Sequence, residues 1–120
     1  MISKSRILIN YIAVSIFIFL ANYSLAANNL VMVTSEYCIY CQIWEKQIGK
    51  IYPKTDIAKN YPLKRIELDD FLKDHYYNVE KTNITPTFIF FEDQNEIGRI
   101  TGYSNPEMFW WQVDEILQRE

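Results

Sequence analysis

Cys38 and Cys41 are the only cysteines of the chain, and two residues separate them. An apolar run at 30–34 precedes the pair, and a helix-like pattern at 39–51 follows it. The spacing predicts that Cys38 lies at a helix N-terminus, where free backbone N–H groups and the helix dipole favour a thiolate. Residues three apart on a helix are neighbours, so the two sulfurs can close a small disulfide. We therefore expect a redox pair with Cys38 as the nucleophile.

The low cysteine count favours redox chemistry over structural cross-linking. Exported domains that depend on disulfides for stability usually carry several pairs at scattered spacings. A bridge that closes so short a loop removes little chain entropy and stabilises little. The pair is therefore expected to carry out redox chemistry rather than to stabilise the fold.

Other uses of the two thiols were weighed. Two thiolates suit Cu(I), so a copper chaperone is the alternative function. Tetrahedral zinc would need two more ligands, and covalent haem is disfavoured because Gln42 stands where c-type attachment requires histidine. The acids at 69, 70 and 74 and the single His75 are interpreted as surface residues. We expect no metal and no cofactor.

The first residues are typical of a secretory signal. Two basic side chains precede an almost uninterrupted apolar stretch at 11–20, and Ser24-Leu25-Ala26 supplies small residues at the positions a signal peptidase reads. We expect a signal peptide at 1–26 and an exported domain at 27–120. The alternative is an uncleaved anchor, because 7–27 is about long enough to span a bilayer.

The charge pattern points to protein partners. Without Lys4 and Arg6 the domain keeps 10 of the 12 basic residues against all 15 acidic ones, a formal charge of −5. A net acidic domain without a run of lysine or arginine offers no footprint for nucleic acid or an anionic membrane. We expect it to bind no nucleic acid and to be a monomer.

The first helix and the closing helix each carry a buried face. Cys41, Trp44, Ile48 and Ile51 form one apolar stripe at helical spacing, which directs Cys41 toward the core and leaves Cys38 at its edge. In the last helix the apolar face is expected to comprise Phe109, Val113, Ile116 and Leu117. Such an arrangement suits an attacking thiol with a resolving thiol behind it.

The remaining pattern predicts one domain in the order β-α-β-α-β-β-α. Pro53 ends or bends the first helix. Pro86 stands directly before a β-type run and marks a strand entrance, because proline cannot donate to a sheet ladder. A polar helix from 69 is expected to carry Phe71, Leu72 and Tyr76, and Ser104 with Glu107 forms a possible capping box for the last helix. The expected strands are 30–34, 63–68, 87–91 and 97–102.

This combination resembles the thioredoxin fold, an α/β fold with a mixed four-stranded sheet flanked by helices. The resemblance rests on the Cys-x-x-Cys helix after a strand, Thr85-Pro86-Thr87 entering a hairpin about 45 residues later, and the closing amphipathic helix. It implies that the bond before Pro86 is cis beside the disulfide and that the backbone of Thr85 pairs with substrate. Tyr37, Ile39 and Tyr40 would complete the docking surface.

More narrowly, the chain is similar to small exported bacterial thioredoxins, including those of the SoxS type. The motifs that carry this similarity are Ser35-Glu36-Tyr37-Cys38-x-Tyr40-Cys41, Leu68-Asp69-Asp70 and Gly98-Arg99-Ile100-x-Gly102-Tyr103. The similarity implies a periplasmic thiol–disulfide oxidoreductase that reduces cysteine-containing partner proteins. A membrane electron donor is then expected, because the bacterial periplasm is kept oxidising.

Two departures from thioredoxin itself stand out. Met32 occupies the position of the family's buried carboxylate, which relays a proton for the resolving cysteine, and Ile39-Tyr40 replaces Gly-Pro between the cysteines. Proton transfer from Cys41 must then use water or another group, with Glu36 and Arg65 as candidates.

Overall fold

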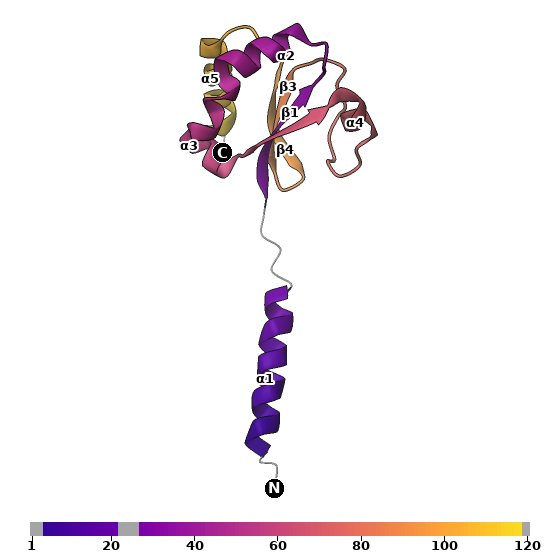
Figure 1. Cartoon of the computed structure of the whole chain (residues 1–120), viewed down its shortest axis with the longest axis vertical. Helices are drawn as coiled ribbons and strands as arrows, with labels where there is room; N and C mark the ends of the chain where they lie inside the picture. Colours follow the sequence, from indigo (N-terminus) through magenta and orange to yellow (C-terminus); the bar gives the residue numbers. More distant parts are fainter. Residues whose placement is uncertain (1–3, 22–26, 119–120) are drawn as a thin grey trace.

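The computed structural model describes residues 4–21 and 27–118 (Figure 1). The helix α1 (Lys4–Ala21) lies within the expected signal peptide. The expected cleavage site, Ser24-Leu25-Ala26, lies outside the described residues. Among the helices of the described ranges, none is both long and apolar enough to cross a membrane.

The domain is built on a four-stranded mixed sheet with the order β2-β1-β3-β4. β1 runs parallel to β2 and antiparallel to β3, and β3 pairs antiparallel with β4. The two central strands are buried along almost their whole length, which explains their nearly continuous apolar sequences. The strands are β1 (Asn28–Thr34), β2 (Leu63–Glu67), β3 (Thr87–Glu92) and β4 (Asn95–Thr101).

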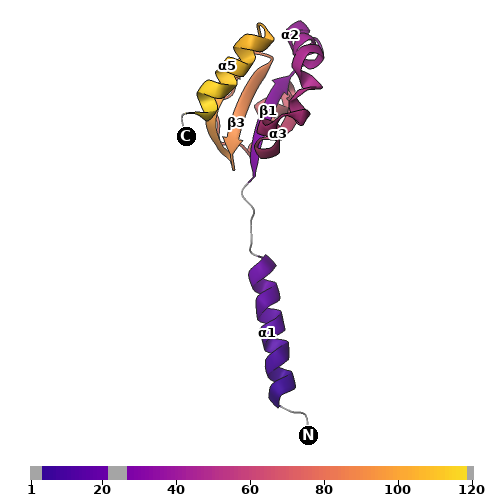
Figure 2. The ribbon, with the colours of Figure 1, turned by 90° about the vertical axis from the view of Figure 1, so that its left-hand side faces the viewer.

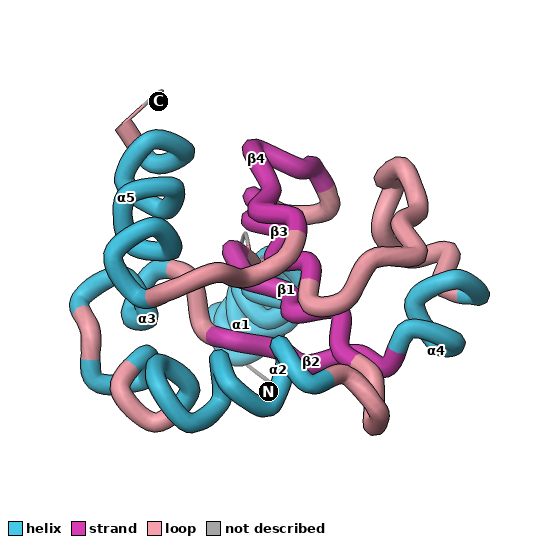
Figure 3. Tube along the Cα trace, turned by 90° about the horizontal axis from the view of Figure 1, so that it is seen from above, coloured by secondary structure: helices cyan, strands magenta, loops and turns pink. Residues whose placement is uncertain are grey.

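Helices cover both faces of this sheet, but unequally. The helix α5 and the region from α2 to α3 lie side by side over one face (Figure 2), whereas α4 lies on the opposite side (Figure 3). The predicted order and the mixed sheet flanked by helices are confirmed. The helical segments are α2 (Ile39–Trp44), the π-helical η1 (Glu45–Gly49), the 3-10 turn η2 (Tyr52–Lys54), α3 (Asp56–Asn60), α4 (Leu68–Lys73) and α5 (Pro106–Leu117).

Each face of the sheet has its own hydrophobic core. The larger one, which we call the site-side core, joins the sheet to α2, α3 and α5, and its buried residues include Leu30, Met32, Cys41, Trp44, Ile48, Tyr52, Phe88, Phe90, Phe109, Val113 and Ile116. The smaller one, the far-side core, comprises Val31, Val33, Phe71, Ile89 and Phe91. Alternate residues of each central strand thus serve opposite cores, as the pleat requires.

The predicted apolar stripe of the first helix is wrong at its end. Ile51 is 54% exposed, whereas Tyr52 is fully buried. The reason is the π turn at Glu45–Gly49, which accommodates one residue more than an α-helical turn and shifts the buried face by one position. Cys41, Trp44 and Ile48 are buried as predicted.

Two further local predictions are also wrong. Tyr76 does not lie on α4, because the helix ends at Lys73 and Asp74 is already extended. The cap of α5 is Asn105, whose side-chain Oδ1 accepts a hydrogen bond from the Met108 N–H at 2.9 Å. With Pro106 as the first helical residue, Asn105 is the cap position, and its amide oxygen accepts from the N–H of the third helical residue.

Gly98 permits the close approach of α5 to β4. A Cβ at this position would lie 2.7 Å from Cγ2 of Ile116, which is shorter than a non-bonded contact allows. Packing against Ile116 therefore excludes a side chain at this position. Gly102, by contrast, has a φ of +79°, a conformation that glycine adopts without strain.

The direction of β1 separates the two ends of the domain. The strand starts at Asn28, just after the expected signal peptide, and ends at Thr34, just before the cysteine pair. A strand of this length spans about 23 Å at about 3.3 Å per residue. The start of the domain and its cysteines therefore lie at opposite ends of the sheet.

Candidate active site

The cysteine pair forms a disulfide at the start of α2. Cys38 is the N-cap, with extended backbone at φ −88° and ψ 106°, and its Cα lies 5.2 Å from that of Cys41. Its Sγ accepts a hydrogen bond from the Cys41 N–H at 3.1 Å, and its carbonyl accepts one from the Gln42 N–H at 3.2 Å. The predicted helix start at Cys38 is confirmed, and a backbone donor points at its sulfur.

The two sulfurs differ in environment. Cys41 is 2% exposed and belongs to the site-side core together with Met32 and Trp44, while Cys38 is only partly buried and packs against that core. An incoming group can therefore meet Cys38 but is kept from Cys41. This is the asymmetry expected from the helical spacing.

The loop before β3 lies at the same end of the sheet. Thr87 pairs with Val33 in the antiparallel ladder, so Pro86 lies next to the end of β1. That strand ends four residues before Cys38. The Thr85–Pro86 peptide bond is cis, as the resemblance implied. Pro86 is buried, and its carbonyl accepts a hydrogen bond from the Gly102 N–H at 2.8 Å. The fold thus brings together the cysteines and the predicted substrate-binding loop.

A second contact ties this end of the sheet to the cysteine-bearing helix. The Tyr103 hydroxyl donates to Oε1 of Gln47, which lies in the π turn after α2. Gly102 is hydrogen-bonded to the Pro86 loop, and the adjacent Tyr103 is hydrogen-bonded to the helical segment after α2. This dipeptide therefore connects the loop to the cysteine-bearing helix. No sequence signal indicated this link, because its two side chains lie 56 positions apart.

Three of the predicted docking residues, Tyr37, Ile39 and Tyr40, are exposed beside Cys38, whereas Pro86 is buried. Tyr37 is 89% exposed, Ile39 60% and Tyr40 56%, and Ile84 of the neighbouring loop is 53% exposed. Large apolar side chains grouped this way on a soluble surface are typical of a protein-binding site. Thr85 is partly buried. The role of these residues in binding remains a prediction.

Among the described residues no carboxylate or imidazole is buried, since Asn29 and Thr87 are the buried polar side chains there. Met32 is fully buried in the same core as Cys41, and the candidate Glu36 is exposed. Arg65 is engaged by Glu45 through two hydrogen bonds, from Nε at 2.6 Å and Nη2 at 2.9 Å, which raise the pKa of the guanidinium. Neither predicted candidate is therefore presented to the Cys41 sulfur by a contact seen here.

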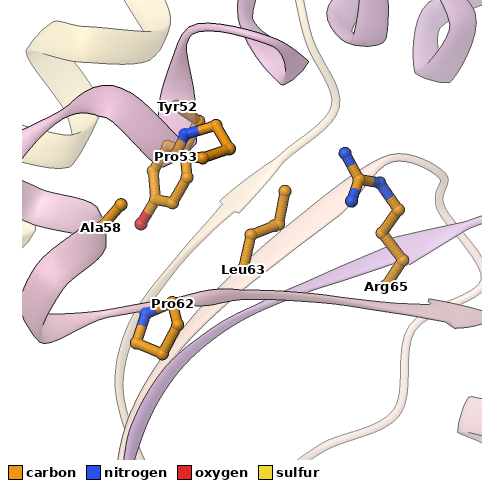
Figure 4. A pocket seen from close by; sticks show the side chains of 6 residues that line it. All are labelled: Tyr52, Pro53, Ala58, Pro62, Leu63 and Arg65. Carbon is orange, nitrogen blue, oxygen red and sulfur yellow. The ribbon is translucent and has the colours of Figure 1, made fainter.

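A separate pocket of about 310 Å³ lies beside β2 (Figure 4). Its walls are mostly apolar, with the Arg65 side chain at one end, and the lining residues are Tyr52, Pro53, Ala58, Pro62, Leu63 and Arg65. Apart from the proton-transfer candidate Arg65, none of the predicted site residues lines it. Within the described ranges, no group of three or more histidine, cysteine or acidic side chains is arranged to hold a metal ion.

The chain is similar to known proteins in sequence and in fold. Residues 26–117 match the family model of the thioredoxin-like domain. The structure is similar to the reduced periplasmic thioredoxin SoxS of Paracoccus pantotrophus, with 28% identity and a TM-score of 0.65 over 78% of this chain and 99% of that one. No curated protein sequence matches the chain significantly.

Two more distant structures share the fold. A thioredoxin of Thermus thermophilus is 24% identical, with a TM-score of 0.52 over 77% of this chain and 72% of that one. The thioredoxin Mala s 13 of Malassezia sympodialis is 14% identical, with a TM-score of 0.55 over 76% and 75% of the two chains.

Proposed function

The chain belongs to the thioredoxin-like domain family and is a thiol–disulfide oxidoreductase, and we propose that it reduces disulfides of partner proteins in the periplasm. Cys38 is the attacking cysteine and Cys41 the resolving one in this proposal. The observation that carries it is the asymmetry of the pair: a partly exposed Cys38 sulfur that accepts a backbone N–H, with a buried sulfur directly behind it.

The proposed reaction proceeds in two exchanges. The Cys38 thiolate attacks one sulfur of a partner disulfide, forms a mixed disulfide and releases the other partner sulfur as a thiolate, which takes up a proton. Cys41, deprotonated, then attacks the Cys38 sulfur and releases the second partner thiol. Two electrons have passed to the partner, and the chain is left with the Cys38–Cys41 disulfide. A dithiol donor must reduce this disulfide before the next cycle.

The surroundings of Cys38 support a protein substrate. Tyr37, Ile39 and Tyr40 offer exposed apolar surface, and Thr85 before Pro86 offers its backbone to an extended segment. Each of these contributions is part of the proposal. Such a surface suits cysteine-containing proteins better than small polar disulfides.

Export is proposed on two grounds. Residues 1–26 have the composition of a signal peptide, and the SoxS protein to which the chain is similar is described as periplasmic. In an oxidising compartment the electrons would come from a membrane protein that reduces the domain. Export can be checked by fractionating cells that produce the full chain and by sequencing the N-terminus of the mature protein.

The test of the reaction is insulin reduction with a dithiol donor. Wild type is expected to accelerate the reaction, and Cys38→Ser is expected to abolish the acceleration. Cys41→Ser is expected to accumulate a mixed disulfide, which names the partner when the trap is made in the exported compartment. Full turnover by Cys38→Ser would contradict the proposal.

Copper handling by the same thiols has no observation in its favour. A Cu(I) titration of the reduced protein checks it directly, and tight one-to-one binding together with absent insulin reduction would replace the present proposal.

A further inference from the structure

A row of surface side chains leads away from Cys38 along its own helix. Gln42, Lys46 and Lys50 follow Cys38 at intervals of four residues, and side chains at this spacing lie on one face of a helix. All three are exposed. Lys54, also exposed, follows four residues later in the separate 3-10 turn η2, and we call Lys46, Lys50 and Lys54 the lysine row.

The positive charge of the lysine row is not neutralised nearby. Within the described residues, none of these three lysines takes part in an ion pair. Asp56 and Glu45, the acids that lie near the row in the sequence, are already engaged, since Asp56 pairs with Lys59 and Glu45 with Arg65. The row therefore presents free ammonium groups to solvent.

This flank also contrasts with the rest of the domain. Residues 46–65 contain six basic side chains and one acidic one, whereas the rest of 27–120 contains four basic and fourteen acidic ones. The domain is therefore electrically polarised although its net charge is negative. The net charge of the whole domain conceals this polarity.

The lysine row lies within reach of a protein held at Cys38. At 1.5 Å per residue, Lys46 is about 12 Å and Lys50 about 18 Å along the helix from Cys38. A typical interface of about 800 Å² per partner extends roughly 16 Å from its centre. Charges on such a partner would approach the lysines to within about one Debye length, about 8–10 Å at physiological salt.

We propose that the lysine row selects protein disulfides whose reactive cysteine is flanked by acidic side chains. The proposal rests on the proposed function and names the class of substrate for the same site. Attraction between opposite charges would speed the encounter and orient the acidic side of the partner along α2 and η1. Glu36 is exposed two residues before Cys38. Its negative charge would repel acidic side chains of the partner there, so that the acidic side of the partner is favoured beside the lysine row.

The experiment compares three peptide disulfides of equal length, in which three Glu, three Gln or three Lys residues follow the cysteine. The full chain in a non-ionic detergent is assayed with each probe and with the small neutral hydroxyethyl disulfide. At low ionic strength we expect kcat/KM for the Glu probe to exceed that for the Gln probe about fivefold to tenfold, with the Lys probe slowest. Added salt should bring the three values together.

Lys73→Glu changes the charge by the same amount as Lys46→Glu and serves as its control. Lys46→Glu should lower the preference for the Glu probe, and Lys46→Glu with Lys50→Glu should abolish or reverse it. Lys73→Glu, at an exposed site on α4 across the sheet, should keep the wild-type preference. Hydroxyethyl disulfide should react equally with all of these proteins.

The outcomes separate the two proposals. Equal kcat/KM for the three probes in wild type, or a preference that Lys46→Glu and Lys73→Glu lower alike, would overturn the selection by the lysine row while leaving disulfide reduction intact. Absence of turnover with every probe, hydroxyethyl disulfide included, would overturn the proposed function and this inference with it.

Discussion

The two faces of the sheet are built from the same strands but are covered very differently. The site-side core lies under α2, α3 and α5 and contains most of the large buried side chains. The far-side core has five buried residues and is closed by the six-residue α4 and by 74–86, a segment that forms neither helix nor strand. Only the first of these cores contains Cys41.

The difference shows where the fold is held most firmly. Trp44, Phe88 and Phe109 contact one another with ring centroids 4.9–5.7 Å apart, directly beside the helix that carries the cysteines. Such aromatic clusters restrict side-chain motion and contribute beyond the area they bury. The strongest packing therefore supports the sulfur that must stay in place during exchange.

The far side is closed by a few specific contacts instead. Tyr77 stacks on Phe91 at 4.2 Å, and the Lys81 ammonium lies 4.5 Å from the centre of the Phe71 ring and donates to the Asp74 carbonyl at 2.8 Å. These contacts replace the helix that would otherwise cover the face. We therefore expect changes on the far side to affect stability more than activity.

The largest effect is expected from truncating one phenylalanine in each core. Phe88→Ala should lower the free energy of unfolding by about 3–5 kcal/mol and Phe71→Ala by about 3 kcal/mol, because each leaves a cavity and the far-side core is smaller. Urea unfolding measures both losses, and insulin reduction per folded molecule should fall only for Phe88→Ala. Equal loss of activity in the two variants would contradict the proposed division. If either variant does not fold, the Phe→Leu pair serves the same comparison.

A smaller effect is expected where α5 packs against β4. Gly98→Ala should cost about 1–3 kcal/mol, because its Cβ would overlap Ile116 and force the helix outward. Gly102→Ala is the control: its Cβ meets nothing within 4 Å, so only the strain of a positive φ, about 1–2 kcal/mol, is expected. Thermal unfolding distinguishes them, because Gly98→Ala should cost less in an Ile116→Ala background, which lacks both Cγ atoms, whereas Gly102→Ala should cost the same there.

The pH dependence of the free energy of unfolding should distinguish Tyr52 on the site side from Tyr77 on the far side. Burial, and then Tyr61, raises the pKa of Tyr52 well above its usual value, and burial raises that of Tyr77, with Tyr76 and Asp74 adding to it. The unfolded chain ionises near pH 10, so stability should be unaffected below that pH and fall above it, as the unfolded state comes to bind fewer protons.

Tyr52→Phe should reduce the alkaline loss of stability more than Tyr77→Phe does, since Tyr52 is fully buried and Tyr77 is not. At neutral pH it should cost about 1 kcal/mol, because the hydroxyl donates to the Tyr61 carbonyl at 2.7 Å. Urea midpoints between pH 7 and about 11 provide the measurement. An identical alkaline slope in both variants would argue against deeper burial on the site side.

The smallest effect is expected on the far-side segment. Lys81→Gln removes a cation–π contact and a hydrogen bond, together worth about 0.5–1 kcal/mol at a partly exposed site. Amide exchange in 74–86 should accelerate while insulin reduction stays at the wild-type rate. The matched variant Lys73→Gln, at an exposed site, should leave the rate of amide exchange in 74–86 unchanged.

Much of this architecture was predictable from local patterns. The apolar runs of the central strands, the helix start at Cys38 and Pro86 at a strand entrance each depend on a few consecutive residues, and all three are confirmed. The phase error between Ile51 and Tyr52 arose because periodicity assumes regular α-helix, and a π turn has no clear sequence signature. Asn105 was identifiable as a cap, but Ser104 with Glu107 matched a better-known pattern.

The unpredicted features depend on contacts between distant segments. The Tyr103–Gln47 hydrogen bond and the exclusion of a side chain at Gly98 by Ile116 exist only once β4 and α5 are in place. The polarity of the charged surface was likewise concealed by a net charge summed over the whole domain. For the active site, the sequence predicted which residues meet but not what holds them together.

The course of β1 bears on how the protein can be attached without harm. Since the polypeptide enters at one pole of the domain and exposes its sulfur at the other, a fusion partner, an affinity tag or an immobilising surface joined ahead of Asn28 would leave the reactive pole unobstructed. The same geometry would hold if the signal peptide were retained as an anchor: a protein attached to a membrane by its N-terminus would still have Cys38 accessible from the surrounding solution.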